Sequence, residues 1–147
     1  MIQSPAHTLP DIRHSVHLHA PIDQVWHAVA TAEGLAGWWM PNTLVPEAGR
    51  DFVLHAGPWG DSECRVLEVR PPHHLSFRWD TDWRLTFELQ PTAEGETELT
   101  LIHGGWDAAK STRFGQPHTA VRKVMDGGWD KLIHDKLPAY VQQRTGE

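Results

Sequence analysis

The chain has 147 residues, of which 39% are hydrophobic and 22% charged, and its formal net charge is −6. This length predicts one domain with a sizeable core, and the negative charge argues against bulk binding to nucleic acid or to an anionic membrane surface. The single cysteine, Cys64, excludes a disulfide framework within the chain, and no apolar run approaches the roughly 18 residues of a membrane span.

The N-terminal third predicts one strand followed by two short helices. Residues 12–18 alternate between apolar and polar side chains, as in a half-buried strand. Pro21 opens a first helix over residues 21–31, and "AEGLAGWW" at 32–39 predicts a second helix that its glycines interrupt. Because residues 1–20 contain no apolar stretch typical of a signal peptide, we expect a cytoplasmic protein.

The middle of the chain has the period-two pattern of strands, separated by short turn signals rich in Gly, Pro and Asp. Short connections between successive strands favour an antiparallel meander. Apolar side chains alternate with charged or hydroxyl side chains, so one face of the sheet should be solvated. The predicted strands after the first are 43–47, 51–56, 63–70, 74–80, 83–90 and 96–103.

A loop over residues 104–117 leads to one long amphipathic helix over residues 118–143. Pro138 should bend its last turns. The pair Gly127-Gly128 is unfavourable in a helix. Since Gly128 falls on the apolar side, we expect the missing side chain to let the helix bend or the sheet approach. A methyl group there would then destabilise the fold, because it would press into a close contact or narrow the space between the helix and the sheet. We expect 11–142 to form the domain, with loose ends at 1–10 and 143–147.

Four segments resemble a known family and keep its order along the chain. They are "APIDQVWHAVATAEGLAGWW" at 20–39, "CRVLEVRPPHHLSFRW" at 64–79, "LTLIHGGW" at 99–106 and "GGWDKLIHDKL" at 127–137. The chain resembles the START-like, or SRPBCC, superfamily and, within it, the homologues of the activator of heat-shock protein 90 ATPase. The resemblance implies an α+β helix-grip fold, like that of birch-pollen allergens. In it, a curved antiparallel sheet of about seven strands surrounds the long C-terminal helix.

The resemblance also implies a cavity between the sheet and the long helix, which would bind an apolar or aromatic small molecule. For the adjacent Trp38 and Trp39 we favour simple packing of both. The alternative is that one enters the core and the other faces the cavity. Large rings that fill the cavity completely are the alternative to a pocket. The residues expected to line the cavity are Trp39, His55, Phe77, Trp79, Trp83, Phe87, Leu101, His103, Met125, Trp129 and Ile133.

Residue types with reactive side chains form no recognisable catalytic motif. The chain lacks a nucleophile elbow, a P-loop and a dinucleotide fingerprint, so we expect no catalytic residue and no cofactor. Its eleven histidines include no His-Glu-x-x-His pair and have no cysteine pair beside them, which favours surface histidines over a metal site. His103 is expected to be either a hydrogen-bonded core residue, as the resemblance favours, or an anchor for the ligand.

Two other functions stay open at this point. The resemblance allows contact with heat-shock protein 90 as a co-chaperone, although 147 residues leave no room for the separate N-terminal domain of those activators. An enzyme of the cyclase or aromatase type, which acts through cavity shape and a few polar groups, would leave no short motif. The expected partners are therefore an apolar ligand and a possible chaperone, with the chain a monomer or homodimer.

Overall fold

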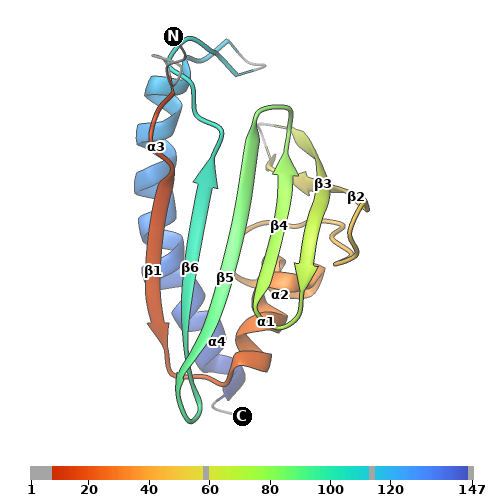
Figure 1. Cartoon of the computed structure of the whole chain (residues 1–147), viewed down its shortest axis with the longest axis vertical. Helices are drawn as coiled ribbons and strands as arrows, with labels where there is room; N and C mark the ends of the chain where they lie inside the picture. The colour runs from red at the N-terminus through yellow and green to blue at the C-terminus, as the bar shows by residue number, and fades with distance from the viewer. Residues whose placement is uncertain (1–7, 58–59, 113–114, 146–147) are drawn as a thin grey trace, which may run out of the picture.

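The computed structural model describes residues 8–57, 60–112 and 115–145, together with the side chains of these residues up to 142. Six strands and a long helical segment make up most of the structure (Figure 1). The elements are β1 (Ile12–Leu18), α1 (Ile22–Ala30), α2 (Ala32–Trp38), β2 (Asp51–His55), β3 (Asp61–Arg70), β4 (His74–Trp79), β5 (Trp83–Ala93), β6 (Glu96–Gly104), α3 (His118–Lys131), the π-helical turn η2 (Leu132–Lys136) and α4 (Leu137–Thr145). The long helical segment, called the C-terminal rod below, consists of α3, η2 and α4 and covers residues 118–145.

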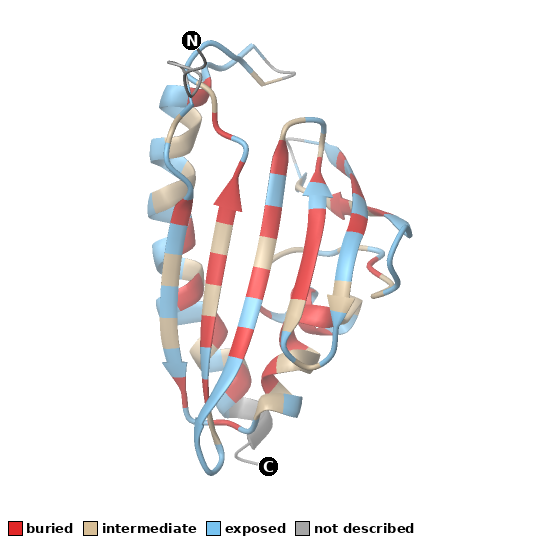
Figure 2. Cartoon of the chain, in the orientation of Figure 1, coloured by how far each residue is buried: buried red, intermediate tan, exposed pale blue. Residues whose placement is uncertain are grey.

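The sheet is an antiparallel meander from β2 to β6, with β1 added beside β6. The strand order is β1-β6-β5-β4-β3-β2, and every neighbouring pair runs antiparallel. Buried and exposed residues alternate along the strands, most clearly along β5 (Figure 2). The α+β helix-grip architecture is thereby confirmed, because one face of the sheet packs on the helices and the other meets solvent.

The strand predicted at 43–47 is absent, which leaves six strands where about seven were expected. Thr43 explains the difference. Its backbone N–H donates to the carbonyl of Val53 at 3.0 Å, but its side-chain Oγ1 accepts the Val53 N–H at 2.9 Å, where a ladder would use a backbone carbonyl. The Glu47 N–H then turns back to the Val45 carbonyl, and Pro46 has no N–H to donate. The segment consequently runs beside β2 without extending the sheet.

Two short helices follow β1, as predicted, and they cross closely. Thr31 ends α1 and caps α2, since its Oγ1 accepts the N–H of Gly34 at 2.9 Å. A Cβ atom built at Gly34 would lie 2.1 Å from the carbonyl oxygen of His27. Only glycine therefore fits where α2 passes over α1.

The C-terminal rod passes behind β1 and β6 in Figure 1, and its helical course is continuous from His118. The turn before Pro138 is π-helical, and the N–H of Leu137 donates to the carbonyl of Leu132, five residues earlier. Proline cannot donate to the carbonyl of His134, so the wider turn lets the helix continue past it.

The close approach expected at Gly128 is wrong. A Cβ atom built at Gly128, or at Gly127, meets nothing within 4 Å. Both glycines lie within α3, and open space separates the side of the helix at Gly128 from the sheet.

The chain ends lie partly outside the described residues, namely 1–7 and 146–147, so the predicted loose segments stay predictions there. Next to the first of them, the N–H of Leu9 donates to the carbonyl of Trp106 at 3.1 Å. Among the described residues, no helix combines the length and apolar character needed to cross a bilayer.

Candidate functional site

A pocket of about 500 Å³ opens between α3 and the concave face of the sheet, and its surface is mainly apolar. The sheet contributes residues of β3, β4 and β5, and α3 supplies the opposite wall. The lining residues are Trp39, Met40, Ala56, Ser62, Trp79, Asp80, Trp83, Thr112, Gln116, Ala120, Val121, Val124, Met125, Gly128, Trp129 and Leu132.

The adjacent tryptophans at the end of α2 have separate positions. Trp38 is buried with 4% of its surface exposed, and its indole N–H donates to the carbonyl of Ala28 at 2.8 Å, which ties α2 to α1. Trp39, half-buried, lines the pocket instead. The chain leaves helical geometry at Trp39, with φ −124° and ψ −91°. The ring of Trp38 can therefore lie in the core while that of Trp39 lines the pocket.

Indole rings form a continuous wall on the inner side of the pocket. The centroid of Trp39 lies 5.4 Å from that of Trp79 and 5.0 Å from that of Trp129. Trp79 in turn meets Trp83 edge to face at 5.2 Å. Such offset and edge contacts are favourable between aromatic rings, and they hold the wall in one shape.

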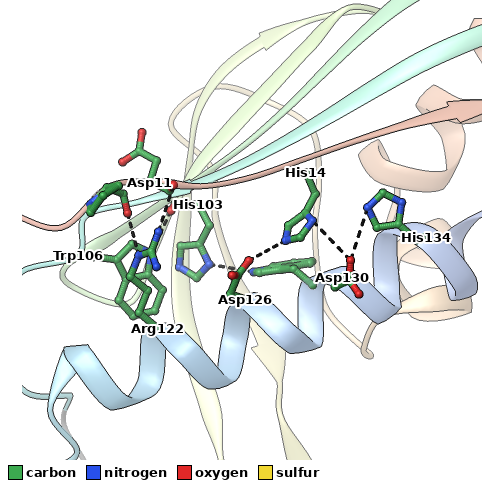
Figure 3. A network of polar contacts seen from close by, with 10 residues as sticks. Asp11, His14, His103, Trp106, Arg122, Asp126, Asp130 and His134 are labelled. Atoms are coloured by element: carbon green, nitrogen blue, oxygen red, sulfur yellow. Dashed lines mark hydrogen bonds and ion pairs between the residues drawn. The ribbon is translucent and has the colours of Figure 1, made fainter.

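His103 lies directly beneath this wall, at the end of β6, and is fully buried. Its Nδ1 accepts the indole N–H of Trp129 at 2.9 Å (Figure 3). Trp79 stacks on its ring with the centroids 5.2 Å apart. Burial lowers the pKa of His103 to about 3, with the charges of Arg122 and His118 adding to the effect. The imidazole is therefore neutral at pH 7, with its proton on Nε2, and it anchors α3 to the sheet.

Two indole N–H groups of the wall have no acceptor among the described residues. They belong to Trp79 and Trp83, whose side chains are otherwise buried. By contrast, the indole N–H of Trp106 donates to the carbonyl of His103 at 2.9 Å. A buried donor without a partner costs about 1–3 kcal/mol. These two N–H groups are not exposed at the pocket surface, so an acceptor on a bound molecule would remove the penalty only if a ring rotates toward the pocket.

The structure brings together only part of the set predicted from the sequence. Trp39, Trp79, Trp83, Met125 and Trp129 line the pocket. The buried members, packed in the core behind the pocket surface, are Phe77, Phe87, Leu101, His103 and Ile133.

His55 is the remaining member of that set, and it stands apart from the pocket. It ends β2 with its side chain 43% exposed, and its Nδ1 pairs with Asp61 at 2.8 Å. The neighbouring Ala56, by contrast, does line the pocket.

Sequence reasoning missed the outer rim of the pocket. Val124 on α3, with 75% of its surface exposed, lines the mouth, as do Thr112 and Gln116 from the loop before the helix. An exposed valine in a helix is ordinary by itself, so its pattern gave no signal. The sequence pattern did indicate Val121 and Leu132, because they fall on the apolar side of the helix.

The pocket's chemistry is that of enclosure. Among the described residues that line the pocket, only Asp80 has an ionisable side chain. Asp80 lies at the turn between β4 and β5 and has a positive φ of 59°. Cys64 lies in β3 and is buried, and this burial raises the pKa of its thiol to about 12, so it is not a thiolate nucleophile at pH 7.

Solved structures with the same fold include a Bacillus halodurans protein, BH1534, which is 41% identical. The match covers 92% of this chain and 99% of that chain, with a TM-score of 0.82. A Mesorhizobium loti protein, MLL2253, is 23% identical over 90% of this chain and 97% of its own, with a TM-score of 0.78.

An HSP90 activator from Plasmodium falciparum is 18% identical over 86% of this chain and 93% of its own, with a TM-score of 0.69. No match was found among curated proteins. The sequence model described as "Activator of Hsp90 ATPase homolog 1-like protein" matches residues 19–142, which include both short helices, the whole meander and most of the C-terminal rod. The chain therefore belongs to the family of proteins like the activator of Hsp90 ATPase homolog 1.

Proposed function

We propose that the pocket binds an apolar or aromatic small molecule that carries a hydrogen-bond acceptor. The observation that supports this most directly is the wall of contacting indoles, in which Trp79 and Trp83 have N–H groups without an acceptor among the described residues. The apolar rings would supply contact area, and the two donors would select for a carbonyl or ether oxygen.

The size of the pocket suits this class of ligand. A volume of about 500 Å³ lies within the range of pockets that hold drug-sized molecules. A ligand that removes about 200 Å² of apolar surface from water gains roughly 5 kcal/mol at about 25 cal/mol per Å². This gain alone corresponds to a dissociation constant of about 0.2 mM, and losses of translational and rotational freedom offset part of it, so we expect affinity in the sub-millimolar to millimolar range.

A matched pair of probes tests the two parts of the proposal. Fluorenone and fluorene share a tricyclic frame, but only fluorenone has a carbonyl oxygen. Both should raise the melting temperature by mass action, and fluorenone should bind up to about tenfold more tightly, since one hydrogen bond contributes about 0.5–1.5 kcal/mol. Native mass spectrometry of freshly purified protein would show whether a natural ligand is retained.

Val124→Lys should weaken binding of both probes, because the charged side chain would stand at the mouth of the pocket. The stability of the free protein should change by no more than about 0.5 kcal/mol, as for other exposed positions. Thr119→Lys is the matched control: it adds the same charge to an exposed position of α3 outside the pocket lining. Equal affinities in these two variants would argue that the probes bind elsewhere.

Contact with Hsp90 is the second candidate, and membership of the family together with the likeness to the Plasmodium falciparum HSP90 activator favours it. Either function would be exerted in the cytoplasm, where a reduced, buried Cys64 would be stable. Addition of the protein should then raise the ATPase rate of Hsp90. A clear rise, together with no thermal response to any apolar compound, would favour the chaperone function over ligand binding.

A further inference from the structure

One side of the C-terminal rod, away from the pocket, carries a cluster of histidine and aspartate side chains. Asp126, Asp130 and His134 follow one another at four-residue intervals and so lie on one side of the helix. They face His14, whose side chain points from β1 toward them (Figure 3). The sequence separates His14 from this part of the helix by more than 110 residues, and the fold alone brings them together.

The distances leave room for an ion among three of these side chains. Asp130 Oδ1 lies 4.0 Å from Nδ1 of His14 and 3.8 Å from Nε2 of His134. The three ligand atoms all lie within 4.8 Å of one another. Ligand atoms at about 2.0–2.1 Å from a tetrahedral zinc ion are roughly 3.3 Å apart, so small rotations of the exposed Asp130 and His134 side chains would close the site.

The fourth side chain fixes the orientation of His14. Its Nε2 lies 2.8 Å from Oδ1 of Asp126, and because a carboxylate oxygen can only accept, Nε2 carries the proton. When the ring carries no second proton, its lone pair is on Nδ1, the nitrogen that faces Asp130. A carboxylate that holds one nitrogen of a histidine while the other binds a metal is the usual second layer of a zinc site.

We infer that this cluster binds a divalent transition-metal ion of the zinc class. Nδ1 of His14, a carboxylate oxygen of Asp130 and Nε2 of His134 are the ligands, Asp126 orients His14, and water completes the coordination. Two imidazoles and one carboxylate suit zinc and its neighbours better than calcium or magnesium, which prefer oxygen ligands only. This inference departs from the sequence-based expectation of no metal site.

The metal would link β1 to the C-terminal rod, because His14 belongs to β1 and the other two ligands belong to the rod. His134 lies in the π-helical turn η2, and such turns occur often at functional sites. The pocket residues Val121, Met125 and Leu132 lie on another side of the rod, so the metal site and the pocket are separate. Metal binding would stabilise the folded chain without occupying the pocket.

A second group of histidines serves as an internal control. His17, His19 and Glu96 also lie within reach of one another, at the far end of β1. There Glu96 Oε1 already lies 2.6 Å from Nε2 of His17, and the same carboxylate would have to serve as both ligand and orienting group. We therefore expect weaker binding at this group.

The test uses the full chain without an affinity tag and with Zn²⁺ or Co²⁺ as the metal. Calorimetry should show one Zn²⁺ per chain, and Co²⁺ should give visible absorption bands of a low-coordinate site with histidine ligands. His134→Ala and Asp130→Asn change exposed side chains and should lower the affinity for Zn²⁺ by at least tenfold. Asp126→Asn should lower it by about 10–100-fold through the loss of the orienting carboxylate.

Two further readouts make the result decisive. Zn²⁺ should raise the melting temperature of the wild type but not that of His134→Ala, while circular dichroism shows that the variant is folded. His17→Ala should leave the affinity within about twofold of the wild type. The inference is overturned if the wild type binds no Zn²⁺ at about 100 μM, if His134→Ala and Asp130→Asn bind as well as the wild type, or if His17→Ala is the variant that abolishes binding.

Discussion

Replacing His103 by asparagine should make the free energy of unfolding less dependent on pH between about 4 and 7. In the wild type, the fully buried imidazole accepts a hydrogen bond from Trp129 through Nδ1. Asparagine places an oxygen near the position of that nitrogen, so the acceptor is retained. It cannot take up a proton in this range, however, so the titration of residue 103 is removed.

The sign and size of this pH dependence of the free energy of unfolding follow from the pKa of His103, which burial lowers from 6.5 to about 3. Below pH 6.5 the unfolded chain binds a proton that the folded chain does not bind until about pH 3. The stability contributed by the neutral imidazole is thus fully present above pH 6.5 and is lost as the pH falls. The loss is about 1.4 kcal/mol per pH unit, which amounts to about 3 kcal/mol at pH 4.

Urea unfolding of the two proteins at pH 7, 5.5 and 4 measures this difference. Asparagine is smaller than histidine, so His103→Asn should be less stable than the wild type at pH 7. That gap should shrink by about 3 kcal/mol at pH 4, because only the wild type loses the stability of residue 103. The other ten histidines and all carboxylates occur in both proteins and cancel in the comparison. A gap that is the same at all three pH values would refute the assignment of a buried, neutral His103.

The remaining predictions concern α3 and the crossing of the short helices. Trp129→Phe should cost about 1–3 kcal/mol in urea unfolding, because it leaves the buried Nδ1 of His103 without a donor while keeping most of the ring volume. Gly127→Ala and Gly128→Ala should each be neutral or stabilising by about 0.5–1 kcal/mol, since a Cβ atom there meets nothing within 4 Å. Gly34→Ala should instead cost about 1–3 kcal/mol, because its Cβ would lie 2.1 Å from the carbonyl oxygen of His27. A destabilised Gly128→Ala, or a neutral Gly34→Ala, would contradict this account.

The elements that the sequence predicted well are those whose side-chain pattern alone decides the structure. The alternation in 83–90 and 96–103 follows directly from one buried face, and β5 and β6 contain these segments. Residues 43–47 were also predicted as a strand, but there the decisive feature is the hydrogen bond from Val53 N–H to the Thr43 hydroxyl, which no pattern reveals. The predicted strand 63–70 has another feature that the pattern does not reveal: the register shifts between Val66 and Glu68, and the apolar Leu67 is left 37% exposed.

The predicted pocket set mixes lining residues with core residues, because alternation identifies the buried face of a strand but not the depth along it. Phe77 and Trp79 lie on the same face of β4, yet only Trp79 lines the pocket. The difference depends on where the C-terminal rod crosses the sheet. That crossing is fixed by long-range contacts such as Trp129 with His103 and Arg122 with the carbonyl of Pro10, at 2.8 Å.

The glycine pair in α3 now has a different explanation from a close approach to the sheet. The rod does not rely on helix propensity at this point, since Trp129, Arg122 and Asp126 each bond to a residue outside the helix, on the sheet or just before β1. It can therefore tolerate two glycines. Gly128 lines the pocket and Gly127 does not, so a methyl group at Gly128 would occupy pocket space while one at Gly127 would not. If the pocket binds a ligand, the two alanine variants should gain similar stability, and only Gly128→Ala should alter the affinity for fluorenone.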